Sequence, residues 1–494
     1  MGRLGEAHTP LIKMSRLFAA FSTLIPAILQ ANAGSPGVFL DASAGPYPLS
    51  IYVKTPQVIP GVARVEIRGG ARGLSTIRLV QTPISGPGTR FAPSPEEMQR
   101  SKADPKFFTG SLWLMTPGSW KVHIMVAGDQ GPGELFVPIP AAMMRTSTMN
   151  YALGSLLSML GLALIVGAIC IAGASVREAH LEPGHMPSRA NKESGRLFML
   201  VTAVAIGGLL FAGNQWWENE AERYKRQVYE PLAFNFEIDP DGNFFGSLGK
   251  SGAPQKSDDM IPDHGHYMHL FVVSMPAMDK MWHLHPDMQV GGVFTMRMAG
   301  MDAGKYQIFG DIVHANGFPE TAATEWELKK ALSEQPLEGD DSRTSAPPAG
   351  SNPDPGTSVL GDKYRMVMVR GNKPVKAGEA SHFTFRVETR TGRPAEDLEL
   401  YMGMPGHAAF IKHDRSVFAR VNPSGSAPLA AIQMVSSQAA QPSTDRSNHS
   451  MNMGIPAEIT FPYGFPSGGG YRIFVQIKRA GKIETGTFDV NVLE

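Results

Sequence analysis

Apolar and polar residues alternate through the first part of the chain. Stretches such as Leu49–Lys54, Val62–Ile67 and Ser119–Val126 place apolar residues at nearly every second position, and Gly- and Pro-rich turns separate them. A side-chain period of two predicts strands with one buried face. Several short strands separated by such turns are typical of an antiparallel sandwich. We therefore expect a β-sandwich over residues 34–146.

Two uncharged, almost wholly apolar runs interrupt this pattern. The first covers residues 151–174, and the second covers residues 197–217 and ends in a tryptophan pair. About 20 apolar residues are enough for a helix to cross a bilayer, and tryptophan favours the membrane interface. The pattern predicts a two-helix transmembrane hairpin with a short connecting loop, residues 175–196. The charged residues 218–229 are expected to continue the second helix as a stalk.

The first residues indicate the side of the membrane. Residues 1–33 contain a short basic patch, an apolar run and an Ala-x-Ala cleavage site, which is the pattern of a secretory signal peptide. An uncleaved anchor is the alternative, and Met14 is a candidate for the true start. Basic residues flank the hairpin on both sides, so charge counting does not decide its orientation. The signal does: the β-domains are expected outside the membrane, and the loop 175–196 is expected in the cytoplasm.

The second half of the chain contains an internal repeat. Residues 230–330 and 362–494 are both rich in strand patterns, and "GKYQIF" at Gly304 matches "GYRIF" at Gly470 with one gap. Residues 331–361 have the composition of a disordered linker, and residues 436–452 are a polar insertion. The predicted fold class is mainly β: three immunoglobulin-like sandwiches plus the transmembrane hairpin.

Composition narrows the functional classes. Lys plus Arg and Asp plus Glu both number 45, so no basic excess indicates nucleic-acid binding. The single cysteine, Cys170, cannot form an intramolecular disulfide. The sequence has no nucleophile elbow, phosphate-binding loop, HExxH or paired CxxC motif. We therefore predict that the protein is not an enzyme.

The repeat's first copy carries a concentration of histidine and methionine. In "MWHLHP", His283 and His285 share one strand face and the apolar Trp282 and Leu284 share the other. Imidazole is a ligand for Cu(II) or Zn, and thioether is a ligand for Cu(I). The sequence therefore predicts a metal site, with copper as the ion and zinc as the alternative; histidines that only support the fold remain the other interpretation. The candidate ligands are His269, His283, His285, His314, Met281 and Met288.

The second copy lacks most of this set. Aligning the two copies places His407 opposite His269, but Arg420 opposite His283, Asn422 opposite His285 and Arg479 opposite His314. A second equivalent metal site is therefore not expected.

Three segments carry a family resemblance. They are "MHLFVVSMPAMDKMWHLHPD", "YQIFGDIVHANGF" and, in the second copy, "LYMGMPGHAAFIKHDRSVFARVNPSG". They resemble the YtkA-like family over residues 230–330 and 362–494. The resemblance implies extracytoplasmic immunoglobulin-like sandwiches of bacteria, often in copper-linked settings, and hence a place at the bacterial cytoplasmic membrane with the domains on the periplasmic side. It also implies that His269, His283 and His285 are the ligands.

Two functional hypotheses follow from these patterns. The first is a membrane-anchored metal-binding protein that buffers copper or delivers it to a partner. The second is an interaction module that supports a protein partner in a membrane complex, with histidines that only pack. A further possibility is that the two copies form one pseudo-symmetric unit with a site in the first copy alone.

Overall fold

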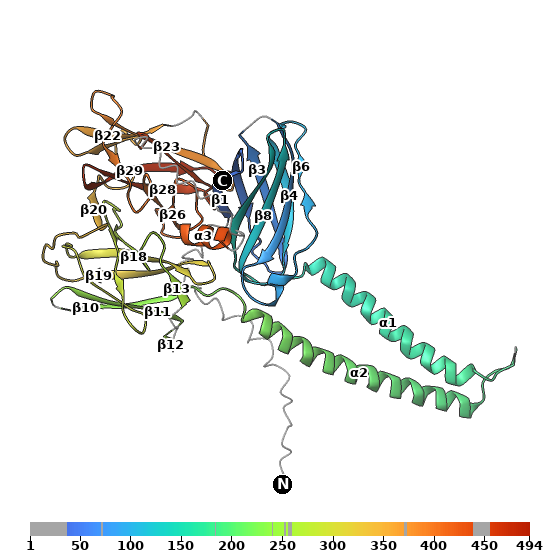
Figure 1. The fold of residues 1–494 in the computed structure, drawn as a ribbon. Coiled ribbons are helices and arrows are strands. Elements are labelled where there is room, and N and C mark those ends of the chain that lie inside the picture. Colours follow the sequence, from blue (N-terminus) through green and yellow to red (C-terminus); the bar gives the residue numbers. More distant parts are fainter. Residues whose placement is uncertain are drawn as a thin grey trace, which may run out of the picture.

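The computed structural model describes residues 37–70, 73–182, 184–239, 241–250, 253–254, 259–369, 373–437 and 455–494. Within these ranges the chain forms three antiparallel β-domains and a pair of long helices (Figure 1). The predicted fold class, mainly β with three immunoglobulin-like sandwiches and a helical hairpin, is confirmed. The predicted signal peptide, residues 1–33, lies outside the described residues.

Domain 1 is a sandwich of two sheets around one apolar core, with strand orders β1-β2-β3-β7-β6 and β5-β4-β8-β9. Alternation fixes the buried face: in β3 the side chains of Ala63, Val65 and Ile67 are buried, and those between them point outward. The elements are β1 (Gly37–Ala44), β2 (Tyr47–Lys54), β3 (Gly61–Gly69), β4 (Leu74–Pro83), the 3-10 helix η1 (Pro87–Arg90), β5 (Glu96–Glu97), β6 (Gln99–Arg100), β7 (Phe107–Leu114), β8 (Gly118–Gly128) and β9 (Gly131–Ala141).

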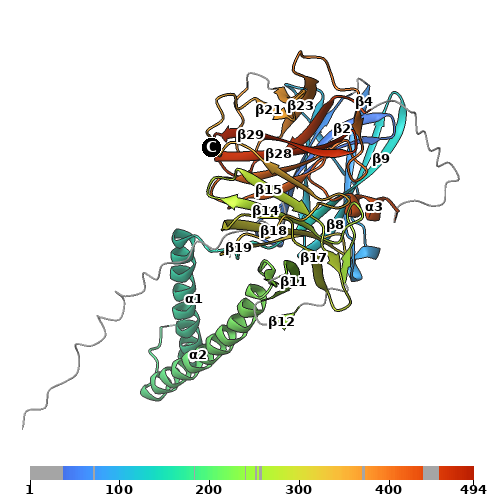
Figure 2. The ribbon, with the colours of Figure 1, turned by 90° about the vertical axis from the view of Figure 1, so that its left-hand side faces the viewer.

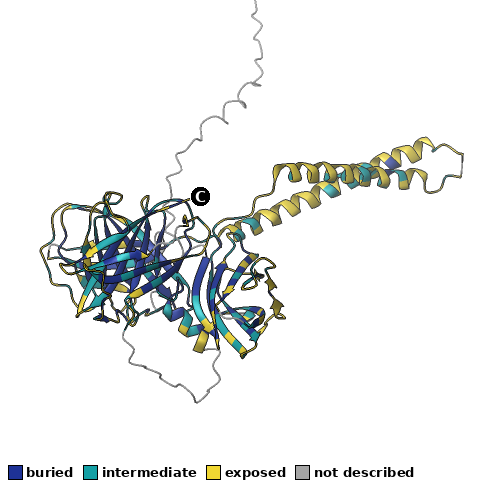
Figure 3. Cartoon of the chain, turned by 90° about the horizontal axis from the view of Figure 1, so that it is seen from above, coloured by how far each residue is buried: buried dark blue, intermediate teal, exposed yellow. Residues whose placement is uncertain are grey.

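The hairpin consists of α1 (Tyr151–Glu178) and α2 (Arg189–Lys225). Each helix is long and apolar enough to cross a membrane. Their apolar side chains are almost all exposed in the isolated chain (Figure 3). The helix α2 begins before the predicted second span and includes most of the predicted stalk. Both helices join the same side of the β-domain block (Figures 1 and 2).

Local sequence fixes the ends and the contact of the hairpin. The side chains of Asn150 and Ser188 accept hydrogen bonds from backbone N–H groups in the first turns of α1 and α2. The buried residues of the two helices are Gly173 and Gly195. A Cβ on either residue would meet the other helix at 3.4 Å or less, so small residues permit the close approach.

Domain 2 has the strand orders β10-β11-β17-β16, with β12 beside β11, and β13-β18-β14-β15-β20, with β19 beside β18. Its core lies between these sheets. Its strands are β10 (Ala233–Ile238), β11 (Asn243–Lys250), β12 (Ala253–Pro254), β13 (Met260–Ile261), β14 (His269–Met275), β15 (Lys280–Leu284), β16 (Asp287–Met288), β17 (Val293–Arg297), β18 (Gly304–His314), β19 (Pro319–Leu328) and β20 (Ser342–Ser345).

Domain 3 has the strand orders β21-β22-β23-β27 and β24-β28-β25-β26, with β29 beside β28. Its elements are β21 (Thr357–Leu360), β22 (Tyr364–Val369), β23 (Ser381–Thr389), β24 (Leu398–Glu399), β25 (His407–Lys412), β26 (Phe418–Val421), α3 (Leu429–Ser437), β27 (Glu458–Tyr463), β28 (Gly469–Arg479) and β29 (Lys482–Val492). The strands β18 and β28 have equal lengths and equivalent neighbours, β14 and β19 in one domain and β25 and β29 in the other. The internal repeat is therefore present in the fold.

Domains 2 and 3 pack sheet against sheet through a shared apolar cluster. Phe271 and Phe309 of domain 2 meet Phe418 and Phe474 of domain 3, and the rings of Phe309 and Phe418 stack with centroids 4.4 Å apart. The outer face of each central sheet is therefore buried by the other domain. His269, His283 and His285 lie on this face, opposite the face that carries Leu270, Trp282 and Leu284.

The segment predicted as a disordered linker, residues 331–361, differs from that prediction. It contains β20 and β21, and β20 pairs with β15 in the sheet that carries the histidines. Its polar composition hides this role, because an edge strand needs backbone pairing rather than apolar side chains. The predicted insertion, residues 436–452, begins inside α3, and most of it lies outside the described residues.

Candidate metal centre

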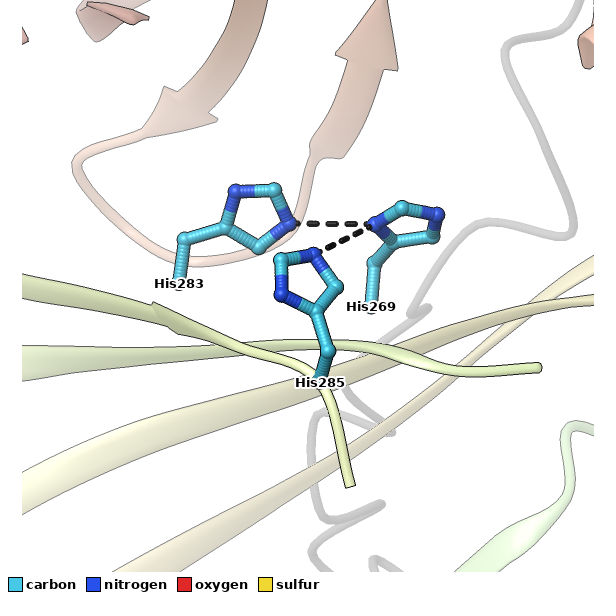
Figure 4. A group of neighbouring side chains, drawn as sticks. All are labelled: His269, His283 and His285. Carbon is cyan, nitrogen blue, oxygen red and sulfur yellow. Dashed lines mark hydrogen bonds between the residues drawn. The ribbon is translucent and has the colours of Figure 1, made fainter. Parts of the chain in front are cut away.

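Three histidine rings converge on one point between domains 2 and 3 (Figure 4). His269 opens β14, His283 lies in β15, and His285 follows that strand. The register of the β14–β15 hairpin pairs Leu270 with Leu284, which brings His269 beside His285. Trp282 and Leu284 enter the domain core, as alternation predicted. Strand pairing and the period of two therefore assemble the cluster.

The rings approach within direct contact distance. His269 Nδ1 lies 3.1 Å from His283 Nε2 and 3.2 Å from His285 Nε2. Four-coordinate zinc with Zn–N bonds of about 2.0–2.1 Å would hold its nitrogens roughly 3.3 Å apart. The spacing in the structure is therefore close to that of a metal-bound set.

The outer nitrogens of two rings meet atoms that only accept hydrogen bonds. His269 Nε2 donates to the backbone carbonyl of Asp263 at 3.1 Å. His285 Nδ1 donates to a carboxylate oxygen of Asp341 at 3.0 Å. A neutral imidazole carries one N–H, so each inner nitrogen keeps a lone pair. The acceptor at the outer nitrogen of each ring fixes its tautomer, as the outer partners of metal-bound histidines do.

The third ring is oriented by domain 3. His283 Nδ1 lies 2.7 Å from Gln476 Oε1, and the amide nitrogen of Gln476 donates to Ser342 Oγ at 2.6 Å. Tyr401 Oη lies 3.4 Å from the same Nδ1. The amide oxygen therefore accepts a hydrogen bond from the Nδ1–H of His283, and His283 Nε2 also presents a lone pair to the centre.

Electrostatics keeps these rings neutral. Burial lowers the pKa of His269, His283 and His285. The positive charge of Arg420 lowers the pKa of His269 further. The hydrogen bond from His285 to Asp341 opposes the effect of burial but does not cancel it. A metal ion binds the neutral form of imidazole. Three neutral lone pairs directed at one point repel each other unless a cation or a proton lies between them, so the arrangement suits a metal ion.

Domain 3 repeats the strand arrangement and one histidine of the site, but not the other two imidazoles. His407 Nε2 donates to the carbonyl of Tyr401 at 3.0 Å, as His269 does to Asp263. Its Nδ1 meets the side-chain oxygen of Asn422 at 3.0 Å, where the first copy has an imidazole. The predicted alignment is confirmed by these contacts.

The two copies exchange contacts across a pseudo-twofold relation. His283 of domain 2 contacts Gln476 of domain 3, and its counterpart Arg420 of domain 3 forms ion pairs with Asp263 and Asp311 of domain 2. Arg420 and both carboxylates are buried or nearly buried. Arginine therefore places a fixed positive charge at the position that a ligand holds in the first copy.

His314, also predicted as a ligand, lies outside the cluster that the other three histidines form. Its Nδ1 contacts Asp259 at 3.0 Å and its Nε2 contacts Glu320 at 2.9 Å, so both ring nitrogens are already used. The counterpart Arg479 pairs with Glu484 in the same way. The position therefore joins the ends of two strands.

The two predicted methionine ligands lie in apolar surroundings. Met281 shares the strand face of His283, but its side chain is fully buried in the apolar cluster between domains 2 and 3. Met288 packs against the core of domain 2 on the opposite sheet. Packing in apolar clusters is the common role of methionine, whereas the Cu(I) interpretation needs a thioether directed at the ion.

One expected pH effect follows from His407. Burial lowers the pKa of His407 to about 3. The unfolded chain then binds a proton that the folded chain excludes, so stability falls as pH drops below the ordinary pKa of about 6.5. Between about pH 7 and pH 5 this group alone should remove about 2 kcal/mol. Denaturant unfolding of the His407→Gln variant should show a correspondingly weaker loss over this range, and an unchanged pH dependence would contradict the assignment.

Comparisons with known proteins add little beyond the fold. A family described as a domain of unknown function (DUF8832) matches residues 358–494, which correspond to domain 3. No curated protein matches the chain. The resemblance to the YtkA-like family therefore stays a prediction.

Solved structures with immunoglobulin-like or fibronectin-like modules align over much of the chain. A bacterial ice-binding adhesin is 6% identical, with a TM-score of 0.15, and the match covers 88% of this chain and 92% of the adhesin. Fibronectin(III)-like modules of Clostridium thermocellum CbhA are 6% identical, with a TM-score of 0.21 and coverage of 58% and 100%. Scores this low carry no argument about function.

Proposed function

We propose that the protein is a membrane-anchored metal-binding protein that holds one transition-metal ion on His269, His283 and His285. The convergence of three imidazole nitrogens within 4.8 Å of one another, with His269 Nδ1 at 3.1 Å and 3.2 Å from the other two, carries this proposal. Three nitrogen ligands with one remaining position suit Zn(II) or Cu(II), and copper has the higher intrinsic affinity for such ligands. Copper is therefore the first candidate and zinc the alternative.

Burial of the ligands supports a role in retaining metal. His269 and His283 are 1% and 0% exposed, and domain 3 covers them. An ion could leave only if the interface between domains 2 and 3 loosened. Buffering is therefore favoured over rapid delivery, and a protein partner that opens the interface would be needed for transfer.

Anchoring is proposed from the two apolar helices. The domains join one end of the hairpin together, so they would lie on the same side of a bilayer (Figure 2). The signal-peptide pattern in residues 1–33 favours the periplasmic side of a bacterial cytoplasmic membrane.

Metal titration of the full chain tests the function. Metal-free protein in detergent would be titrated with Cu(II) and Zn(II) against a chelator of known affinity. We expect one ion per chain, and X-ray absorption of the loaded protein should show imidazole nitrogens at about 2.0–2.1 Å. Failure to retain either ion would overturn the proposal and leave the interaction module as the function.

The carboxylate that orients His285 should matter for affinity. Replacing Asp341 with alanine removes the acceptor of the His285 Nδ1–H, so the ring is no longer held in one orientation. We therefore expect metal affinity to fall about 10–100-fold. The neighbouring Asp340 lies 3.4 Å from His266, which is not in the convergent group, and Asp340→Ala is the matched control. Chelator competition on both variants measures the difference. Equal losses would indicate a general effect of negative charge rather than ligand orientation.

A further inference from the structure

One end of domain 1 presents an exposed apolar patch. Its members are Val62, Phe91, Trp113 and Met115, with exposed fractions of 43%, 77%, 55% and 56%. Val62 and Trp113 are direct cross-strand partners on the outward face of β3 and β7. Adjacent large apolar side chains, such as Val62 and Trp113, mark an interaction surface more often than single ones do.

The register places the patch at the end of domain 1 where the helices attach. Gly61 at the start of β3 pairs with Leu114 at the end of β7, and β8 begins after a short turn at Gly118. The backbone of Ile84 bonds to Ser119, so the segment that leads to η1 and Phe91 lies at the same end.

The helix α2 is tied to this end directly. Tyr224 Oη near its last turn donates to the carbonyl of Ile59 at 2.9 Å, and Met144 of the segment before α1 bonds to the carbonyl of Gln57. The loop that precedes β3 is therefore fixed to both membrane connections (Figures 1 and 2).

The height of the patch above the proposed bilayer follows from helix geometry. The exposed Trp216 and Trp217 would lie at the membrane interface. Seven residues separate Trp217 from Tyr224, a rise of about 10 Å along α2. The headgroup layer on each side is roughly 5–8 Å thick. Residues beside Ile59 would then lie at its outer edge, and side chains directed toward the membrane would enter it.

Exposed cations lie beside members of the patch in the strand register or along the chain. Lys54 and Arg64 are paired across β2 and β3, Arg90 precedes Phe91, and Arg145 lies in the segment before α1. Basic residues beside inserted apolar side chains fit anionic headgroups. A second copy docked on the same face by twofold symmetry would bring the cations of both copies into one interface, and their repulsion disfavours self-association there.

We propose that this patch contacts the headgroup layer of the bilayer that holds the hairpin, with anionic phospholipids against its cations. The inference rests on the proposed membrane anchoring. It gives the β-domain block a second attachment, so the block is held at a fixed tilt against the membrane instead of swinging on the stalk.

Site-directed spin labelling of the full chain tests the contact. Single cysteines would replace Met115 or, as the control at the opposite end of domain 1, Gln130, both in a Cys170→Ser background. The native Cys170, labelled in the unaltered chain, reports whether the hairpin is inserted. After reconstitution in phosphatidylcholine–phosphatidylglycerol vesicles, collision rates with a water-soluble nickel chelate would be measured.

We expect the label at position 115 to collide severalfold less often with the chelate than the label at position 130, with Cys170 fully protected. Equal collision rates at 115 and 130 with Cys170 protected would overturn the patch proposal and leave anchoring intact. Exposure of Cys170 would show that anchoring itself fails. Protection at 115 with dipolar broadening that disappears on dilution with unlabelled chain would assign the face to a second copy and also overturn the proposal.

Discussion

Replacing Arg420 with methionine is expected to lower the free energy of unfolding by about 3–5 kcal/mol, the range typical of breaking a buried ion pair. The substitution leaves the carboxylates of Asp263 and Asp311 without their cation in the interface of domains 2 and 3. Burial opposes ionisation of Asp263, but Arg420 and neighbouring donors outweigh it and lower its pKa. Burial raises the pKa of Asp311 despite Arg420. Removing the guanidinium should therefore force at least one carboxylate to take up a proton.

Arg415 provides a matched control for this variant. It also forms an ion pair between domains 3 and 2, with Glu325, but its side chain is 32% exposed and that of Glu325 is 58% exposed. Because solvent screens such a pair, Arg415→Met should cost no more than about 1 kcal/mol. Denaturant unfolding of the metal-free chain compares the two. Adding Asp263→Asn and Asp311→Asn to Arg420→Met should recover part of the loss, whereas similar small losses for both arginine variants would contradict the buried role.

Much of the architecture could be predicted from period and length alone. The alternation of apolar and polar residues located β3 and β8. The same rule placed His283 and His285 on the sheet face opposite that of Trp282 and Leu284. The repeat predicted which residue of domain 3 stands for each histidine. These features are local, so the sequence contains them directly.

The surroundings of the other predicted ligands have a different physical origin. Whether Met281 reaches a metal or packs in a core depends on what covers the outer face of its sheet, and domain 3 covers it. His314 lies on a neighbouring strand, but its carboxylate partners hold it at the strand end. Contacts between distant segments of the chain decide both cases, and a single sequence does not contain those contacts.

The residues that orient the cluster were missed for the same reason. Asp341 belongs to a polar segment whose composition suggested disorder, and Gln476 lies 193 positions from the histidine that it contacts. The acidic pair "DD" at residues 340 and 341 was a usable signal, because carboxylates commonly orient metal-bound imidazole. No comparable signal marks Gln476.

The exchange between the two copies has a consequence for metal binding. The ligands come from domain 2, but the ring of His283 is oriented by Gln476 and Tyr401 of domain 3. Metal binding should therefore stabilise the closed pair of domains, because anything that binds the folded state alone raises its stability. Domain 3, which lacks the ligand set, would then cover the site and orient the ring of His283.

Replacing His283 with alanine is expected to have the largest effect on metal affinity, a loss of at least about 100-fold, beyond the range for orienting residues. The variant removes one of three convergent nitrogens, and the remaining two cannot complete the set. It also leaves the buried amide oxygen of Gln476 without its donor, which costs about 1–3 kcal/mol of stability by itself. Chelator competition measures the affinity, and the rise in unfolding temperature on adding Cu(II) or Zn(II) gives an independent measure.

His407→Ala separates ligation from support of the fold. His407 is as buried as His283 and also contacts polar partners, Asn422 and the carbonyl of Tyr401. Its loss should destabilise the chain by a comparable amount, yet the variant should keep one ion per chain and its metal-dependent rise in unfolding temperature. If both variants lose metal equally, binding depends only on an intact interface and the convergent histidines are not the ligands. If neither loses metal, the ion binds elsewhere and His283 serves the fold, because a true ligand cannot be removed without weakening the site.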